Sequence, residues 1–555
     1  MMLTLQNIFY THPNEDVLFE NIHLTVNNHD KIALIGNNGV GKSTLLRIIA
    51  GEIVSFNGQK QVDTIPYYVP QLFGQCNDLT VGEALRVAER LNAMKEILGG
   101  IVTEENLEIL NDDWGIEERC EEALAHWQLG DLELTQKMGT LSGGQKTKVF
   151  LAGISIHQPE LIVLDEPSNH LDVAGRQLLY DFIVHTPAAL LVVSHDRQLL
   201  RLPDIICELT RQGIKTYGGN YDFYTEQKNA EKEALHQDIK NKEKALRKAR
   251  DKERETSERQ QKLDARGKKK QEKAGTAGIL MNTLRNKAEN STAKLKNVHS
   301  DKIGDITQNL QTLRSELPDM DKIKFGFDNS TLHKGKIIFK ATGINFGYEK
   351  PVSQTQNKED RKRPEAETPH PTHTQQFLWK ENLDFQITSG ERIAIKGSNG
   401  SGKTTLIKII LGELKPQTGT IYATDNLAVS IDQDYSLIKR DLTVYEQAQQ
   451  FNDAVLQEGE VKSRLNRFLF TKEDWDKPCA VLSGGERMRL ILCCLTLNNR
   501  AQDIIVLDEP TNNLDIQNIE MLTAAINEYQ GTLLVVSHDE TFLEQAGVNR
   551  IITLH

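Results

Sequence analysis

Two glycine-rich loops carry the residue types that bind phosphate. GNNGVGKST spans Gly36–Thr44, follows the apolar stretch KIALI and precedes an amphipathic helical stretch. Glycines let successive backbone N–H groups point at phosphate oxygens, Lys42 would reach the β- and γ-phosphates, and the Ser43 hydroxyl would bind Mg²⁺. A strand, a glycine loop and a helix in this order distinguish a phosphate-binding loop from an ordinary turn. The candidate phosphate-binding residues are Gly36, Asn37, Asn38, Gly39, Val40, Gly41, Lys42, Ser43 and Thr44, and Gly397, Ser398, Asn399, Gly400, Ser401, Gly402, Lys403, Thr404 and Thr405.

A pair of adjacent carboxylates follows a buried-strand pattern in each half of the chain. In LIVLDEP, Asp165 can hold Mg²⁺ through water and Glu166 can polarise an attacking water molecule. His195 ends the next apolar stretch, AALLVVSHD, which places it at the same carboxyl edge of a parallel sheet. A single histidine after a strand is often structural, but its register with the other motifs favours a functional role. The corresponding residues of the second half are Asp508, Glu509 and His538, with Thr404 as the second candidate Mg²⁺ ligand.

A short serine–glycine turn, LSGGQ, precedes the first carboxylate pair by about twenty residues. Alone it predicts only a helix N-cap. Its fixed position before the carboxylates makes the motif specific evidence for a functional turn. The candidate residues are Ser142, Gly143, Gly144 and Gln145, and in the second half Ser483, Gly484, Gly485 and Glu486. Glu486 stands where the first copy has glutamine, a substitution that we do not expect to be inactivating.

The whole series of motifs occurs twice. The offset between copies is 361 at the lysines, 341 at the signature serines and 343 at both the glutamates and the histidines. The copies are therefore collinear, and the second has about twenty residues fewer between its glycine loop and LSGG. A duplicated domain of this kind predicts an α/β fold with two tandem P-loop NTPase domains, residues 1–221 and 326–555.

Each half resembles an ATP-binding cassette domain, with its Walker A, signature, Walker B, D-loop (SNHLD, TNNLD) and switch-histidine motifs. The resemblance implies Mg-dependent hydrolysis of ATP to ADP and phosphate. It places Tyr10 and Tyr348 where an aromatic ring stacks on adenine, and Gln71 and Gln433 in Q-loops that sense Mg²⁺ and the γ-phosphate. In this family two cassettes form a head-to-tail sandwich. Ser142 would then complete the site built on Lys403, and Ser483 the site built on Lys42, within a single chain that functions as a monomer.

The net charge of −12 is unevenly distributed. Residues 228–302 contain 22 Lys and Arg against 12 Asp and Glu, a local charge of +10, so the remainder of the chain carries −22. A basic middle in an acidic chain favours contact with a polyanion.

No apolar run approaches the ~18 residues of a membrane-spanning helix, and no export signal is visible. The six cysteines show no CxxC pairing, which indicates a reduced, cytoplasmic protein.

The segment 222–325 is predicted to form a helical hairpin between the two domains. Residues 222–263 are almost all helix formers, and Ile306, Leu310, Leu313 and Leu317 form a heptad seam in the returning helix. We expect about forty residues in each direction, a length of ~60 Å, and a turn at a basic tip near 266–278. The candidate RNA-binding residues at this tip are Arg266, Lys268, Lys269, Lys270 and Lys273. The alternative is a solvated coiled-coil spacer, which would not require KKK at its far end.

Two cassettes, a helical linker and no membrane domain together resemble the F subfamily of ATP-binding cassette proteins (ABC-F). The resemblance implies a translation factor that binds the ribosome at the tRNA exit site, with its linker directed toward the P-site tRNA and the peptidyl-transferase centre. The long linker favours members that confer antibiotic resistance by ribosomal protection. The alternatives are a DNA-maintenance ATPase and the energising subunit of a membrane transporter.

Two further expectations concern segments within the cassettes. The first half shows no obvious additional arm. The insertion at 350–376 is rich in Pro, Thr, Lys and Glu and is expected to be a disordered surface loop.

Overall fold

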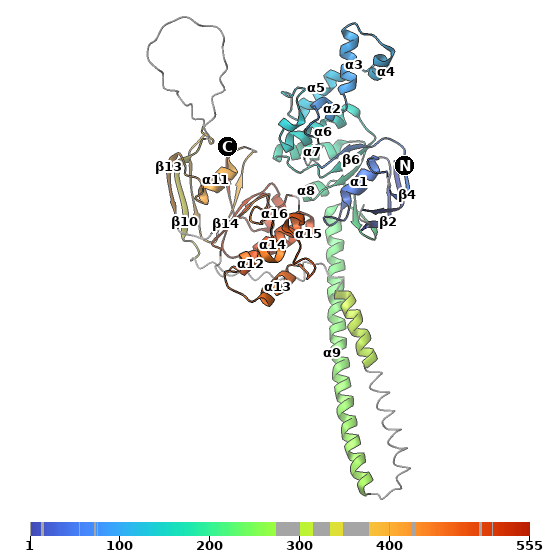
Figure 1. Cartoon of the computed structure of the whole chain (residues 1–555), viewed down its shortest axis with the longest axis vertical. Helices are drawn as coiled ribbons and strands as arrows, with labels where there is room; N and C mark the ends of the chain where they lie inside the picture. The colour runs from blue at the N-terminus through green and yellow to red at the C-terminus, as the bar shows by residue number, and fades with distance from the viewer. Residues whose placement is uncertain are drawn as a thin grey trace. The chain divides into compact units, whose positions relative to one another are not determined.

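The computed structural model describes the chain except for residues 1, 13–15, 55, 72–73, 75, 274–299, 315–332, 348–376, 399, 425–427, 499–501, 513 and 555, and it leaves the side chains of 260, 264–265 and 267–273 undescribed. The described chain divides into two units (Figure 1). One combines Met1–Tyr221 with Lys324–His555, and the other is Asp222–Ile323. The first unit contains two α/β domains, as the duplicated motifs predicted.

A six-stranded sheet, in the order β5-β6-β7-β3-β8-β9, forms the centre of the N-terminal domain. Its strands are parallel except for β9, which pairs antiparallel with β8. Every residue of β6 and β7 is buried, which explains why both read as continuous apolar runs rather than alternating patterns. The strands are β3 (Lys31–Ile35), β5 (Tyr67–Val69), β6 (Leu161–Asp165), β7 (Ala189–Val193), β8 (Ile205–Thr210) and β9 (Gly213–Gly218).

A small antiparallel sheet, in the order β2-β1-β4, packs with α1 on one side of this domain's core. Its strands are β1 (Leu3–Thr11), β2 (Val17–Val26) and β4 (Asn57–Val62). The helices of the domain are α1 (Lys42–Ala50), α2 (Val81–Ala84), α3 (Ala88–Leu98), α4 (Glu104–Leu110), α5 (Ile116–His126), η1 (Met138–Thr140), α6 (Gly143–His157), α7 (Val173–His185) and α8 (Arg197–Leu200).

The C-terminal domain repeats this arrangement with a five-stranded parallel sheet, β14-β15-β16-β12-β17, and a small antiparallel sheet, β11-β10-β13. Its strands are β10 (Ile337–Asn345), β11 (Leu383–Thr388), β12 (Arg392–Lys396), β13 (Thr418–Ala423), β14 (Ala428–Ile431), β15 (Ile504–Asp508), β16 (Thr532–Val536) and β17 (Arg550–Thr553). Its helices are α11 (Lys403–Ile410), α12 (Val444–Gln450), α13 (Glu458–Arg467), η3 (Cys479–Val481), α14 (Gly484–Leu497), α15 (Ile516–Glu528) and α16 (Glu540–Gln545).

The helices α3 and α4 account for the extra residues between glycine loop and signature in the N-terminal domain. They pack against each other and project from the domain (Figure 1), whereas the C-terminal domain passes from α12 to α13 without such a pair. The expectation that the first half carries no additional arm was therefore wrong. Leu98 and Val102 of this projection are 72% and 61% exposed. Because apolar residues also occupy exposed positions here, the sequence pattern did not indicate a separate helical pair.

In the second unit, α9 (Tyr221–Lys273) is one uninterrupted helix of 53 residues, and residues 300–314 form a helix that runs alongside it (Figure 1). An ion pair between Arg314 and Glu243 joins the two helices at 2.5 Å. Leu310 is buried, and Ile306 and Leu313 are half-buried among exposed neighbours, as the heptad seam predicts. Leu317 lies outside the described residues.

Two details of the predicted hairpin were wrong. The first helix continues through Gly267 to Lys273, so the basic stretch from Arg266 is helical rather than part of a turn. At 1.5 Å per residue, 53 residues extend ~80 Å rather than ~60 Å. The helix persists because a single glycine costs only about 1 kcal/mol in a helix, which the strong helix formers around Gly267 offset. The turn itself falls in 274–299, outside the described residues.

Among the described helices, none is both long and apolar enough to cross a membrane. All six cysteines are free thiols, and all but Cys76 are buried.

Candidate active sites

The first glycine loop connects β3 to α1 and is closed by its own lysine. Lys42 Nζ donates hydrogen bonds to the carbonyl oxygens of Gly36 at 2.7 Å and Asn37 at 3.2 Å. Gly41 caps α1 with a φ of 100°, and a Cβ there would lie 2.7 Å from a methyl carbon of Leu18. Only glycine fits this position, so the loop holds the lysine and the N-terminus of α1 toward one point.

The second glycine loop has the same geometry between β12 and α11. Lys403 Nζ donates to the carbonyl oxygens of Gly397 at 2.9 Å and Ser398 at 3.1 Å. The indole N–H of Trp379 donates to the Ser401 carbonyl at 2.9 Å and fixes the middle of the loop. The two loops are therefore equally pre-organised to bind phosphate.

The structure brings together the hydroxyl and carboxylate predicted to hold Mg²⁺ in each site. Burial raises the pKa of Asp165, although hydrogen bonds from Ser43 and Tyr68 oppose this rise. Asp165 Oδ1 is buried and has no hydrogen-bond partner among the described residues. In the second site, Thr404 Oγ1 donates to Asp508 Oδ2 at 3.4 Å. A hydroxyl beside a buried carboxylate with an unused oxygen is a donor set that fits Mg²⁺.

Each catalytic glutamate candidate lies beside its histidine. His195 Nε2 is 3.3 Å from Glu166 Oε1, and His538 Nε2 is 3.2 Å from Glu509 Oε1. Burial raises the pKa of Glu166 to about 8 and that of Glu509 to about 7. The pKa of His195 is lowered well below its usual value, and that of His538 to about 4, chiefly by burial. In each site, burial thus disfavours the charged form of both the imidazole and the carboxyl.

Both glutamates have a left-handed backbone, with a φ of 51° at Glu166 and 50° at Glu509. A non-glycine residue pays a conformational cost of order 1 kcal/mol in this region. The backbone N–H groups of the glutamates donate to Val193 at 2.9 Å and Val536 at 2.8 Å, which anchors both turns to the neighbouring strand. The turn at the end of each strand therefore places the carboxyl at the edge of the sheet that also carries the histidine.

The signature turns cap α6 and α14 by the same reciprocal hydrogen bonds. The Ser142 N–H donates to Gln145 Oε1 at 2.9 Å, and the Ser483 N–H donates to Glu486 Oε2 at 2.8 Å. Glu486 therefore reproduces the cap made by glutamine, and Lys477 neutralises it at 3.2 Å. A Cβ on Gly144 would lie 2.6 Å from the His170 carbonyl oxygen, so the signature turn packs directly against the SNHLD loop.

A pocket of about 560 Å³ joins the first glycine loop to the signature of the other domain. Ser483 and Gly484 lie on its wall together with Lys42, as the sandwich arrangement predicted. Gln71 and Gln433 also line this pocket, Gln433 from a loop that was expected at the second site. Other predicted residues on its wall are Asn38, Gly39, Gly41, Ser43, Thr44, Asp165, Glu166 and His195. The pairing of Ser142 with the Lys403 site stays a prediction.

The D-loop aspartates were absent from the predicted site residues. Asp515 Oδ2 accepts a hydrogen bond from the Asn38 N–H of the opposite domain at 2.8 Å. Asp172 acts on the other site, where its charge opposes the effect of burial on the Lys403 pKa. The repeated SNHLD and TNNLD motifs were visible in the sequence, but their partners lie in the other domain.

Tyr10, which was expected to stack on adenine in the first site, lies beside His12, with their ring centroids 6.0 Å apart. Tyr10 packs on the domain core and lies 6.1 Å from Phe19 between ring centroids, whereas His12 and Leu18 line the pocket. The stacking of Tyr10 on adenine stays a prediction, and His12 is a second ring beside it on the pocket wall. Tyr348 and Asn399 lie outside the described residues, as does the insertion at 350–376.

These paired sites agree with a comparison against known families. The model described as "ABC transporter" matches residues 19–169 and 380–512, which together cover half of the chain. The chain belongs to the ATP-binding cassette family. Its two cassettes, with their complete motif sets, make it an ATPase.

Relatives that match nearly the whole chain place it in the ABC-F branch. The chain is 31% identical over 562 residues to "Putative ATP-binding protein YdiF" of Bacillus subtilis, covering 97% of this chain and 77% of the relative. It is 29% identical over 552 residues to "ATP-binding protein Uup" of Escherichia coli, covering 95% of this chain and 76% of the relative.

Solved structures share the twin-cassette fold. A complex of "archaeal ribosomal stalk protein aP1" with "archaeal ribosome recycling factor aABCE1" matches with a TM-score of 0.57 and 19% identity, covering 99% of this chain and 87% of that chain. A "Model of ribosome-bound archaeal Pelota and ABCE1" matches with a TM-score of 0.54 and 18% identity, covering 97% and 74%. At these identities the similarity shows the fold alone.

Proposed function

We propose that this ATPase is a translation factor that binds the ribosome in its ATP-bound form and leaves after hydrolysis. The observation that carries the proposal is the 53-residue helix α9, inserted between two cassettes that both retain lysine, glutamate and histidine. The segment 228–302 carries a charge of +10 in a chain of net −12. A long cationic projection between two ATP-driven domains fits insertion among the phosphates of RNA.

Two structural neighbours support an RNA partner. One is a protein named a ribosome recycling factor, and another is described as ribosome-bound. We extend the proposal to the tRNA exit site, with the linker directed toward the P-site tRNA and the peptidyl-transferase centre in the cytoplasm. Contact with rRNA would then fall on Arg266, Lys268, Lys269, Lys270 and Lys273.

In each proposed site, lysine and the loop N–H groups bind the β- and γ-phosphates of ATP. Mg²⁺ would be held by Ser43 with Asp165, and by Thr404 with Asp508, and would supply charge neutralisation at the phosphates. Gln71 and Gln433 are the further candidate ligands. Glu166 and Glu509 accept a proton from the attacking water, and His195 and His538 orient the carboxyl beside which they lie.

The deciding experiment is sedimentation with purified ribosomes. A Glu166→Gln and Glu509→Gln double variant is incubated with ribosomes and either ATP or ADP, and the pellet is assayed for the protein. We expect co-sedimentation with ATP and little with ADP. Absence of the protein from the pellet with both nucleotides would contradict the proposal and would favour the DNA-maintenance alternative, which gel shifts with branched and duplex DNA test directly.

Replacement of Lys268, Lys269 and Lys270 by alanine should weaken ribosome binding while sparing ATPase activity measured without RNA. Three lost phosphate contacts would lower the slope of log affinity against log salt by about 2–3. The matched control replaces Lys240, Lys244 and Lys248, three exposed lysines of the same helix, by alanine. It removes the same charge far from the tip, so equal losses in both triple variants would indicate general attraction rather than recognition by the tip.

Protection against ribosome-targeting antibiotics is the further part of the proposal that rests on linker length. It predicts that the ATPase restores translation in a cell-free system inhibited by a drug bound near the peptidyl-transferase centre. Restoration should require α9 with its basic end. Unchanged inhibition across drug classes, with ribosome binding intact, would assign the protein to general translation instead.

A further inference from the structure

The two ATP sites differ in what the opposite cassette supplies to them. In the first cassette, Arg176 lies on α7, four residues after the D-loop aspartate Asp172. Its guanidinium is 3.6 Å from Asp196 Oδ2, and its Nε donates to the Leu171 carbonyl at 3.3 Å. The side chains of Arg176 and Asp196 are only 13% and 8% exposed. The ion pair between Arg176 and Asp196 is therefore largely buried, and the hydrogen bond to Leu171 fixes the Arg176 side chain further.

Asp196 directly follows the switch histidine His195 and is itself fixed. It accepts a hydrogen bond from Tyr180 Oη at 2.6 Å, and its other oxygen caps α8 through the N–H groups of Gln198 and Leu199 at 3.0 and 3.3 Å. The switch loop of the first site thus sets where Arg176 lies.

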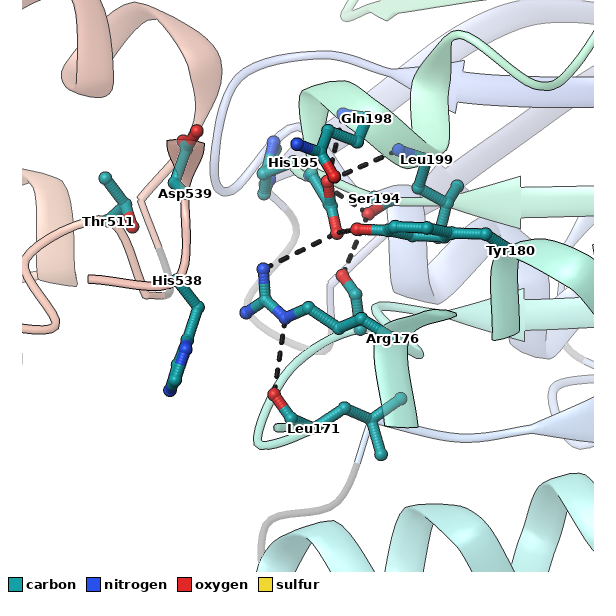
Figure 2. A network of polar contacts seen from close by, with 12 residues as sticks. Leu171, Arg176, Tyr180, Ser194, His195, Gln198, Leu199, Thr511, His538 and Asp539 are labelled. Carbon is teal, nitrogen blue, oxygen red and sulfur yellow. Dashed lines mark hydrogen bonds and ion pairs between the residues drawn. The ribbon is translucent and has the colours of Figure 1, made fainter. Parts of the chain in front are cut away.

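Arg176 is turned toward the switch loop of the second cassette (Figure 2). The figure shows its guanidinium facing the loop that carries His538 and Asp539. Its guanidinium is close enough to Glu509 and His538 for its charge to act on both side chains. Arg176 therefore lies close to the catalytic pair of the second site.

A second arginine of the first cassette crosses the same boundary. Arg197 is 4% exposed and donates from Nη1 to Gln545 Oε1 at 2.7 Å. Asp196 and Asp539 approach closely enough for each carboxylate to affect the other, and both arginines counter that repulsion at Asp539. Arg176 and Arg197, the two cations that act on Asp539, thus both belong to the first cassette.

At the three corresponding positions, all of which the structure describes, the second cassette carries different residue types. With the offset of 343, Arg176 corresponds to Ile519, Tyr180 to Thr523 and Arg197 to Glu540. Ile519 is buried, Thr523 donates to the Ile519 carbonyl within its own helix, and Glu540 pairs with Lys396 of its own cassette. The first site consequently receives no matching arginine from these positions.

We propose that Arg176 and Arg197 are positioning residues through which the first cassette holds the switch loop of the second site. Hydrolysis at the second site then depends on the switch loop of the first site, whereas the reverse dependence lacks these contacts. The two sites are unequal despite their identical lysine, glutamate and histidine residues, and the second is the controlled one.

The test isolates each site with a single glutamate variant. Glu166→Gln leaves turnover to the second site, and Glu509→Gln leaves it to the first. Adding Arg176→Met should lower kcat of the second site by about 10-fold with little change in KM. The loss of kcat at the first site should be several-fold smaller than this. Arg176→Lys, which keeps the cation, should restore most of the loss. The matched control is Gln177→Met, because the exposed Gln177 bonds only within its own helix, to Asp181 at 2.9 Å.

A readout independent of turnover keeps the proposal testable when a single glutamate variant is inactive. Hydrogen exchange of the switch loops is measured with saturating ATP in the double glutamate variant. Arg176→Met, and separately Arg197→Gln, should speed exchange in the loop around His538 more than in the loop around His195. Equal effects on both loops, or equal losses with Arg176→Met and Arg176→Lys, would overturn the proposal and leave Arg176 a packing residue.

Discussion

Replacing Glu166 and Glu509 by glutamine together is expected to stop ATP turnover while leaving ATP binding intact. Each glutamate is buried beside a histidine, at 3.3 and 3.2 Å, in a site where the carboxyl is the group able to take a proton from water. Glutamine keeps the shape and cannot accept that proton. Loss of a positioned general base costs about 10²–10⁴-fold in rate. Steady-state phosphate release measures the turnover, and equilibrium binding of a fluorescent ATP analogue measures whether ATP binding is intact.

The single variants serve as controls for the double variant. Each should retain turnover from the unmodified site, so that the residual rates report the sites one at a time. Rapid multiple turnover by the double variant would show that neither glutamate acts as the base.

Replacement of Lys42 by methionine is expected to weaken ATP binding at the first site without destabilising the unliganded protein. Burial lowers the pKa of Lys42, which means that the folded state disfavours the charge that ATP requires there. Losing the charged hydrogen bonds to phosphate should weaken ATP binding by about 10–100-fold, or roughly 1.5–3 kcal/mol. Titration calorimetry should then give one tight site rather than two, and the rise in Tm on adding ATP should shrink.

Lys60→Met is the matched control and should show the opposite pattern. Lys60 Nζ donates to the carbonyl oxygens of Ile48 and Ile49 at the C-terminal end of α1, at 2.8 and 3.4 Å. Its loss should lower Tm by removing a cation at a helix C-terminus, worth about 0.3–1 kcal/mol, while two ATP sites remain. A Lys42→Met protein that still binds two equivalents tightly would contradict the role of this lysine.

Residues that act within one cassette were predictable from sequence because their motifs fix both local structure and chemistry. Lys42 begins a helix after a glycine loop, and Glu166 directly follows a strand that is buried on both faces, so their positions follow from periodicity and turn chemistry. The pocket that joins Lys42 to Ser483 followed from the family resemblance instead, since no local pattern indicates which domain a signature turn will face.

Residues whose role depends on the other cassette could not be found in this way. Arg176 reads as an ordinary polar position of an amphipathic helix, and only its place beside Asp196 and opposite His538 gives it a function. His12 lines the pocket two residues after Tyr10, and register shifts interrupt the pairing of β1 with β2 on either side of Tyr10. Such shifts depend on the pairing of strands and leave no mark in single-residue preferences.

The uninterrupted length of α9 has a mechanical consequence. A helix of 53 residues without proline behaves as a stiff rod. A rotation of 10° at the base of a rod ~80 Å long displaces its far end by ~14 Å, more than the diameter of a helix. If the proposed ATP cycle turned the base of this rod by such an angle, its basic end would move by about a nanometre.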